Sequence, residues 1–196
     1  MLHRIGLFGG TFDPVHVGHR ALVNSFLNSG KIDELWIILS PDPPHKADVN
    51  PTEFLHRFKM LHLAFDNFDK IQILSIENKL PKPSYTYRTI QFLRKKYPDQ
   101  SFYYCMGEDS LANFHSWKKP ETILKETDLL VAHRPGAEHK NVDEYTLRKS
   151  DFVDHVPIDI SSTQIKAAIT RNNSIAGLVD TKVETYIRTH KLYLSN

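Results

Sequence analysis

The chain has 196 residues and a mass of 22.7 kDa, with 40% hydrophobic and 24% charged residues. This composition is typical of a globular protein of about one domain and excludes a disordered or fibrous chain. The 25 Lys and Arg residues exceed the 23 Asp and Glu residues by only two, so nothing indicates a protein that coats nucleic acid.

Short apolar runs alternate with longer amphipathic runs, which is typical of a parallel sheet covered by helices. The pattern predicts strands at residues 5–8, 35–39, 71–76, 102–106 and 129–132, with a weaker strand at 152–157. Helices are predicted at residues 18–28, 50–65, 84–97, 163–171 and 181–190, with a short one after Asp109. The second of these helices is predicted to begin with Asn50 as N-cap and Pro51 at its first position, and to bury Phe54, Leu55, Phe58, Leu61 and Phe65. Residues 134–149 are predicted to be a polar, irregular excursion.

These elements predict an α/β fold, a Rossmann-like doubly wound parallel sheet with helices on both faces and a small C-terminal helical part. We expect residues 1–196 to form a single domain. The lone cysteine, Cys105, excludes an internal disulfide and indicates a reducing compartment. Since no signal peptide and no apolar stretch of about 20 residues is evident, we expect a cytoplasmic protein without a membrane partner.

The loop after the first strand, residues 9–19, carries the strongest sign of function, because ligands of such sheets bind at the carboxyl ends of the strands near the switch point. Gly9 and Gly10 are predicted to turn the backbone sharply and to let amide groups approach a phosphate. His16 and His19 are three residues apart at a helix start, with Gly18 between them, so both rings are predicted to donate hydrogen bonds to phosphate oxygens.

Other interpretations of this loop stay open. A single histidine near a helix start is most often a capping or packing residue. The spacing Asp13-x-x-His16-x-x-His19 also fits a metal site, although no glutamate base or further ligand motif accompanies it. The dinucleotide fingerprint and the P-loop are both absent from the sequence.

The segment from Gly9 to Pro14, followed by His16-x-Gly18-His19, resembles the His-x-Gly-His nucleotidyltransferases, and a second segment, Ile160 to Thr163, resembles their second phosphate-binding motif. Further segments are similar to the bacterial-type nicotinate-nucleotide adenylyltransferase family and occur in its order: 41–46, 84–86, 107–109, Trp117 and 134–136. The resemblance covers nearly the whole chain. Two departures are Lys166, where the family usually has arginine, and Lys118, where it commonly has an aromatic residue.

The resemblance implies that ATP and nicotinate mononucleotide are joined into nicotinate adenine dinucleotide with release of pyrophosphate, and that Mg²⁺ bridges phosphate oxygens. It implies that the catalytic residues are His16 and His19, which bind the ATP phosphates, and Lys46, which reaches the transferring phosphoryl group. ATP is expected to contact Gly9, Gly10, Thr11, Phe12, Gly18, Gly107, Asp109, Ser162, Thr163 and Lys166. The pyridine nucleotide is expected to contact Asp13, Tyr85, Thr86, Trp117 and Arg134.

Three alternatives are weighed against this activity. The first is an adenylyltransferase whose substrate is nicotinamide mononucleotide, and the second is one whose substrate is phosphopantetheine. The third is a protein that senses nucleotides without catalysis. No nucleic-acid partner is expected, and the sequence leaves open whether the chain forms a homo-oligomer. The acid and amide substrates are not distinguished by sequence, because the positions of hydrogen-bond donors and acceptors decide between them.

Overall fold

A computed structural model describes residues 2–41, 51–134 and 141–194. Six strands form one sheet in which every neighbouring pair is parallel, in the order β3-β2-β1-β4-β5-β6. The strands are β1 (His3–Gly10), β2 (Glu34–Leu39), β3 (Ile71–Leu74), β4 (Gln100–Gly107), β5 (Asp128–His133) and β6 (Ser150–Asp154). The order reverses direction between β1 and β4, which makes their carboxyl ends the switch point. The predicted Rossmann-like α/β fold is confirmed.

Eight α-helices are present in the described part of the chain, together with two short 3₁₀ turns, η2 (Ile76–Lys79) and η3 (Phe114–Ser116). They are α1 (Val17–Asn28), α2 (Phe54–Phe65), α3 (Thr86–Lys96), α4 (Glu108–Ala112), α5 (Pro120–Glu126), α6 (Glu144–Arg148), α7 (Ser162–Thr170) and α8 (Thr181–Thr189). Within the described ranges, no helix is both long enough and apolar enough to span a bilayer.

The two faces of the sheet carry two separate hydrophobic cores, because side chains of each strand alternate between them. Phe8 of β1 belongs to the core that includes residues of α1, α2, α7 and α8, whereas its neighbour Leu7 belongs to the core that includes residues of α3, α4 and α5. The single cysteine, Cys105, is 1% exposed in the first core, and burial raises the pKa of its thiol. Cys105 therefore serves as a small core residue.

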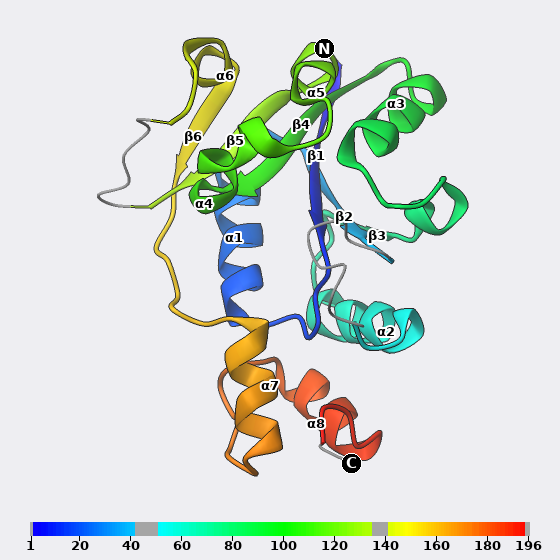
Figure 1. The fold of residues 1–196 in the computed structure, drawn as a ribbon, viewed down its shortest axis with the longest axis vertical. Coiled ribbons are helices and arrows are strands. Elements are labelled where there is room, and N and C mark those ends of the chain that lie inside the picture. The colour runs from blue at the N-terminus through cyan, green and yellow to red at the C-terminus, as the bar shows by residue number, and fades with distance from the viewer. Residues whose placement is uncertain (1, 42–50, 135–140, 195–196) are drawn as a thin grey trace.

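The C-terminal helices α7 and α8 lie together at the end of the molecule toward which β1 runs from the N-terminus (Figure 1). Ser161 is the N-cap of α7, and its capping box with Gln164 explains why the helix begins at Ser162. Asp180 caps α8 through the main-chain nitrogen of Lys182. The predicted small C-terminal helical part is therefore present beside the carboxyl end of β1.

Two predictions on helices were wrong. Helix α2 begins at Phe54 rather than near Pro51, because the Thr52 main chain is occupied outside the helix: its nitrogen donates to Asp13 and its carbonyl accepts from Arg57. Leu55, predicted to be in the core, is 74% exposed, because it lies on the side of α2 opposite the buried face, which carries Met60, Leu61, Ala64 and Phe65. Asn50 lies outside the described residues.

The segment between β5 and β6 is more regular than predicted. Residues 144–148 form α6, capped by Asp143, whose carboxylate accepts from the nitrogen and hydroxyl of Thr146. An Asp at this spacing before a short polar run is an N-cap signal that outweighed the lack of apolar residues. The strand predicted to reach Ile76 ends at Leu74 and continues into η2, and the helix predicted from Ser84 begins at Thr86.

Candidate active site

The chain reverses after β1 at Phe12, not at the glycines. Gly9 and Gly10 belong to β1, and the positive φ of 47° belongs to Phe12, so the predicted glycine turn was wrong. The glycines instead allow close approach: a Cβ at Gly9 would lie 2.9 Å from the Tyr104 hydroxyl, and one at Gly10 would lie 2.8 Å from the Phe12 ring. Both positions therefore accept only glycine without a shift of an aromatic neighbour.

Two cavities open at the switch point. The first, called here the glycine cavity, has a volume of about 140 Å³. It is lined by Gly9, Gly10, Thr11, Ile38, Ser40, Glu77, Ser84, Tyr85, Thr86, Tyr104, Trp117 and Lys118. Trp117 packs edge-on against Tyr104, with ring centroids 5.6 Å apart, so the cavity has an aromatic wall. The structure thus brings Tyr85, Thr86 and Trp117 together with the first three residues of the loop.

Glu77 lies at the glycine cavity as a buried carboxyl group that sequence reasoning missed. It is 8% exposed and accepts a hydrogen bond of 2.7 Å from the Thr89 hydroxyl. Burial raises its pKa, while the hydroxyls of Thr89, Ser40 and Ser84 oppose that shift. Its signal in the sequence was weak, because a Glu between a strand and a proline-containing loop has no pattern of its own.

The second cavity, called here the histidine cavity, has a volume of about 200 Å³. It is lined by His16, Gly18, His19, Leu22, Gly107, Glu108, Asp109, Ala132, Arg134, His155, Pro157, Ile158 and Ile160. The ends of β4 and β5 and the segment directly after β6 contribute to it. His155 directly follows the end of β6, and this place at a carboxyl end is the signal that would have found it.

The two histidines meet in the first turn of α1. Their ring centroids are 3.8 Å apart, and the His16 main-chain nitrogen donates to Nδ1 of His19 at 3.2 Å. Because Nδ1 of His19 accepts this bond, its ring proton is on Nε2. Burial lowers the pKa of His16 to about 4, so His16 is neutral at pH 7. A Cβ at Gly18 would lie 3.0 Å from Nδ1 of His16, which explains the glycine between them.

Asp109 and Arg134 face each other at the mouth of the histidine cavity. An Arg134 guanidinium nitrogen lies 3.1 Å from an Asp109 carboxylate oxygen, and the Asp109 side chain is 81% exposed. Next to them, buried Glu108 accepts a hydrogen bond from the Arg134 main-chain nitrogen and lies 3.1 Å from Nδ1 of His133. Glu108 therefore connects the end of β5 to the start of α4 and holds the main chain of Arg134 in place.

Of the predicted site residues that the structure describes, the others line neither cavity. Asp13 is 4% exposed and is held by Tyr193, Thr52 and Lys166. The Ser162 hydroxyl donates to the Pro14 carbonyl at 3.0 Å, Thr163 is exposed on α7, and Phe12 is 2% exposed in the core. Lys46, with the segment 42–50, lies outside the described residues.

A parallel α/β sheet whose switch point carries paired neutral histidines at a helix start defines a nucleotide-binding protein of the Rossmann-like class. A model of the family described as cytidylyltransferase-like matches residues 7–168. Relatives named probable nicotinate-nucleotide adenylyltransferase share 36% identity in Flavobacterium johnsoniae and 37% in Cytophaga hutchinsonii, each over 97% of this chain and 98% of its own length. The chain belongs to the nicotinate-nucleotide adenylyltransferase family of cytidylyltransferase-like proteins.

Solved structures agree on the fold. The chain superimposes on Plasmodium falciparum nicotinic acid mononucleotide adenylyltransferase complexed with NaAD with a TM-score of 0.81, 23% identity and 97% coverage of both chains. A structure of a putative nicotinate-nucleotide adenylyltransferase from Vibrio parahaemolyticus gives a TM-score of 0.74 at 17% identity, covering 100% of this chain and 98% of that one. At these identities the likeness supports the shared architecture.

Proposed function

We propose that the protein transfers the adenylyl group of ATP to nicotinate mononucleotide, giving nicotinate adenine dinucleotide and pyrophosphate. The observation that carries this proposal is the pair of cavities on the loop of residues 9–19, one with an aromatic wall and one with the paired histidines. A reaction that joins two nucleotides needs two neighbouring sites of different character, and the names of the relatives agree with this reaction.

In this reaction an oxygen of the mononucleotide phosphate attacks the α-phosphorus of ATP. A P–O bond forms there, and the bond from the α-phosphorus to the oxygen bridging to the β-phosphorus breaks, so that pyrophosphate leaves with that oxygen. The attacking phosphate is largely ionised at pH 7, because its second pKa is about 6, and no general base is needed. The protein contributes position and hydrogen-bond donors.

We assign the histidine cavity to ATP. The Nε2–H of His19 and the ring of neutral His16 are placed to donate to phosphate oxygens at the start of α1. Asp109 is placed to accept from a ribose hydroxyl, and Arg134 to pair with a phosphate once its contact with Asp109 opens. Lys166 and Ser162 bind phosphate only after they leave Asp13 and Pro14.

We assign the glycine cavity to the pyridine nucleotide. Trp117 offers a face for stacking on the ring, and the main chain and hydroxyls around Tyr85 and Thr86 offer donors for its carboxylate. Gly9, Gly10 and Thr11, which the sequence associated with ATP, line this cavity instead, so we place them at the mononucleotide. Lys46 is proposed to act between the two nucleotides, on the strength of the family resemblance alone.

Mg²⁺ belongs to the proposal as a companion of the ATP phosphates. Among the described residues, no group of three or more His, Cys, Asp or Glu side chains is arranged to hold a metal ion. Since Mg²⁺ keeps several waters and is commonly bound through substrate phosphates, we propose that it enters as the ATP complex. We also propose that residues 1–196 act as one domain and that the protein works in the cytoplasm.

The test is release of pyrophosphate by the purified protein with ATP, Mg²⁺ and nicotinate mononucleotide. We expect turnover well above a no-enzyme control, and side-by-side assays with nicotinamide mononucleotide decide the acid or amide preference. Release with the amide alone would move the assignment to that substrate. Absence of pyrophosphate with all mononucleotides tried would overturn the proposed enzyme activity.

A further inference from the structure

Arg57 is a buried charge whose hydrogen-bond acceptors are main-chain carbonyl oxygens. It lies on α2, is 1% exposed, and burial lowers its pKa. Its Nη1 donates to the carbonyls of Thr11 at 2.9 Å and Ser40 at 2.8 Å, and its Nε donates to the carbonyl of Thr52 at 2.7 Å. Burying a guanidinium is costly unless its donors are satisfied, so this arrangement calls for an explanation beyond packing.

The carbonyls that Arg57 binds belong to the segments that build the glycine cavity. Thr11 follows β1 and Ser40 follows β2, and both line that cavity. The Ser40 main-chain nitrogen donates to the Gly10 carbonyl at 2.9 Å, so the two strand ends are joined from both sides. The planar guanidinium of Arg57 thus fixes the distance between the segments at Thr11 and Ser40, which form neighbouring walls of the cavity. The ammonium group of a lysine lacks the planar, forked set of donors and does not reproduce this arrangement.

We infer that Arg57 is a positioning residue for the glycine cavity: by holding the carbonyls of Thr11 and Ser40 it sets the shape in which the pyridine nucleotide binds. The inference rests on the proposed function for the identity of that ligand. None of the residues that Arg57 bonds lines the histidine cavity. We therefore expect Arg57 to affect binding of the pyridine nucleotide and not binding of ATP. A residue that only stabilised the fold would affect both.

Arg57→Lys and Arg57→Gln test this inference in steady-state kinetics with both substrates varied, at a temperature well below the melting temperature of each variant. We expect Arg57→Lys to raise KM for nicotinate mononucleotide about 10-fold, while KM for ATP stays within about 3-fold. Arg57→Gln, which loses the charge and most donors, should raise the first KM further. Added guanidinium ion at millimolar concentration should restore part of kcat/KM in Arg57→Gln and leave the parent enzyme unaffected.

Arg94→Lys is the matched control. Arg94 also donates to a main-chain carbonyl, that of Gln100 at 2.8 Å, but at the amino end of β4, away from both cavities. We expect both KM values of this variant to stay within about 2-fold of the parent. Equal rises of the two KM values in Arg57→Lys, or no rise in either, would overturn the inference while leaving the adenylyltransferase proposal in place. A parent protein that releases no pyrophosphate would overturn the proposed function, and the inference with it.

Discussion

At the scale of single residues, the two histidines pack closely, and burial keeps the His16 ring neutral. His16 is 8% exposed with a pKa lowered to about 4 by burial, and His19 lies against the Phe12 ring with centroids 4.9 Å apart. Two charged imidazoles with centroids 3.8 Å apart would repel each other strongly, so neutrality is what allows the pair to form. The proposed adenylyl transfer therefore relies on directed donors, rather than on two fixed cations, to stabilise developing phosphate charge.

Replacing either ring should reduce catalysis far more than it reduces stability. We expect His16→Ala and His19→Ala to lower kcat about 100-fold, the scale found when one positioned donor to a developing charge is removed. Pyrophosphate release measures the effect, with His62→Ala, an exposed histidine of α2, as the control. A kcat within a few-fold of the parent in both site variants would return these histidines to capping and packing roles.

Burial of His16 also makes the free energy of unfolding depend on pH. The folded protein takes up a proton at His16 only near pH 4, whereas the unfolded chain does so near its ordinary pKa of 6.5. The unfolded state therefore binds more protons between these values, and stability falls as pH drops from about 6.5 toward 4. From pH 7 to pH 5 this loss should be about 2 kcal/mol. Urea unfolding of the parent and of His16→Asn at both pH values measures it, and an equal loss in the two proteins would contradict the assignment.

At the scale of elements, Asp13 joins the loop after β1 to the C-terminal helices. Its carboxylate accepts from the Tyr193 hydroxyl at 2.8 Å and lies 3.3 Å from Nζ of Lys166 on α7. Burial alone would raise the pKa of Asp13, but the bonds from Tyr193, Thr52 and Lys166 outweigh it and lower the pKa. Asp13, which the sequence assigned to the substrate, thus holds the C-terminal segment in this structure.

The contact with Tyr193 should be visible in stability. Tyr193→Phe removes a hydrogen bond to a buried carboxylate, and we expect the free energy of unfolding to fall by about 1 to 3 kcal/mol. Denaturant unfolding measures the change, with Tyr145→Phe, whose residue is 44% exposed, as the control. A loss no larger than that of the control would mean that the C-terminal segment is held by its apolar contacts alone.

At the scale of the whole molecule, the sheet and its switch point follow from sequence because buried parallel strands are short apolar runs. The grouping of site residues into two cavities does not follow, since it depends on the angles at which β1, β2 and β4 end. The burial of Arg57 is hidden for a similar reason: its acceptors are carbonyls of segments 5 to 46 residues away in the chain. A main-chain carbonyl can accept a hydrogen bond whatever its side chain is, so such acceptors cannot be recognised in the sequence. The capping box of Ser161 and Gln164 can be recognised, because it depends on the side chains of these two residues.

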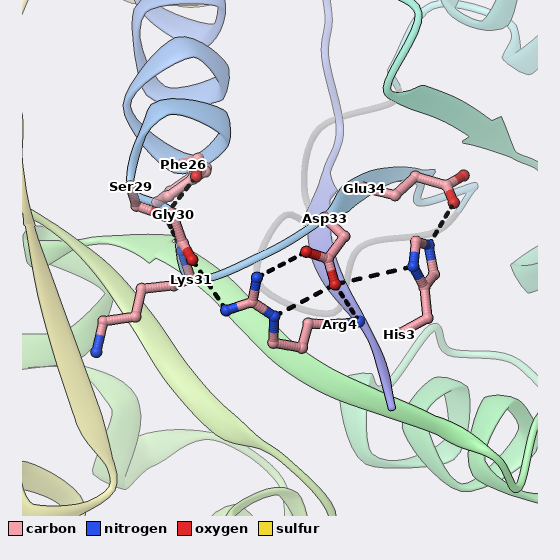
Figure 2. A network of polar contacts seen from close by, with 8 residues as sticks. All are labelled: His3, Arg4, Phe26, Ser29, Gly30, Lys31, Asp33 and Glu34. Carbon is pink, nitrogen blue, oxygen red and sulfur yellow. Dashed lines mark hydrogen bonds and ion pairs between the residues drawn. The ribbon is translucent and has the colours of Figure 1, made fainter. Parts of the chain in front are cut away.

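The amino ends of β1 and β2, at the end of the sheet opposite the cavities, are joined by ion pairs. Figure 2 shows Asp33, before β2, accepting from the Arg4 side chain and main chain at the start of β1, with His3 beside Glu34. The nearest Arg4 nitrogen lies 2.6 Å from an Asp33 oxygen, and Arg4 holds the pKa of Asp33 at about 2. The Arg4 and Asp33 side chains are 41% and 36% exposed, so water screens the pair.

Because this network lies at the amino ends of the strands, stability and catalysis should separate there. Because water screens this exposed ion pair, Asp33→Asn should lower Tm by no more than about 4 °C at pH 7. Because the pKa of Asp33 is lowered on folding, its contribution to stability is complete at pH values above its ordinary pKa of 3.8. The contribution is lost as pH falls through about 2, so the difference in Tm between parent and variant should vanish there. Thermal melts at the two pH values test this, while both KM values should stay within about 2-fold of the parent. A change in KM for either substrate would contradict this separation. It would show that the loss of the Arg4–Asp33 ion pair at the amino ends of β1 and β2 is transmitted along these strands to the cavities at their carboxyl ends.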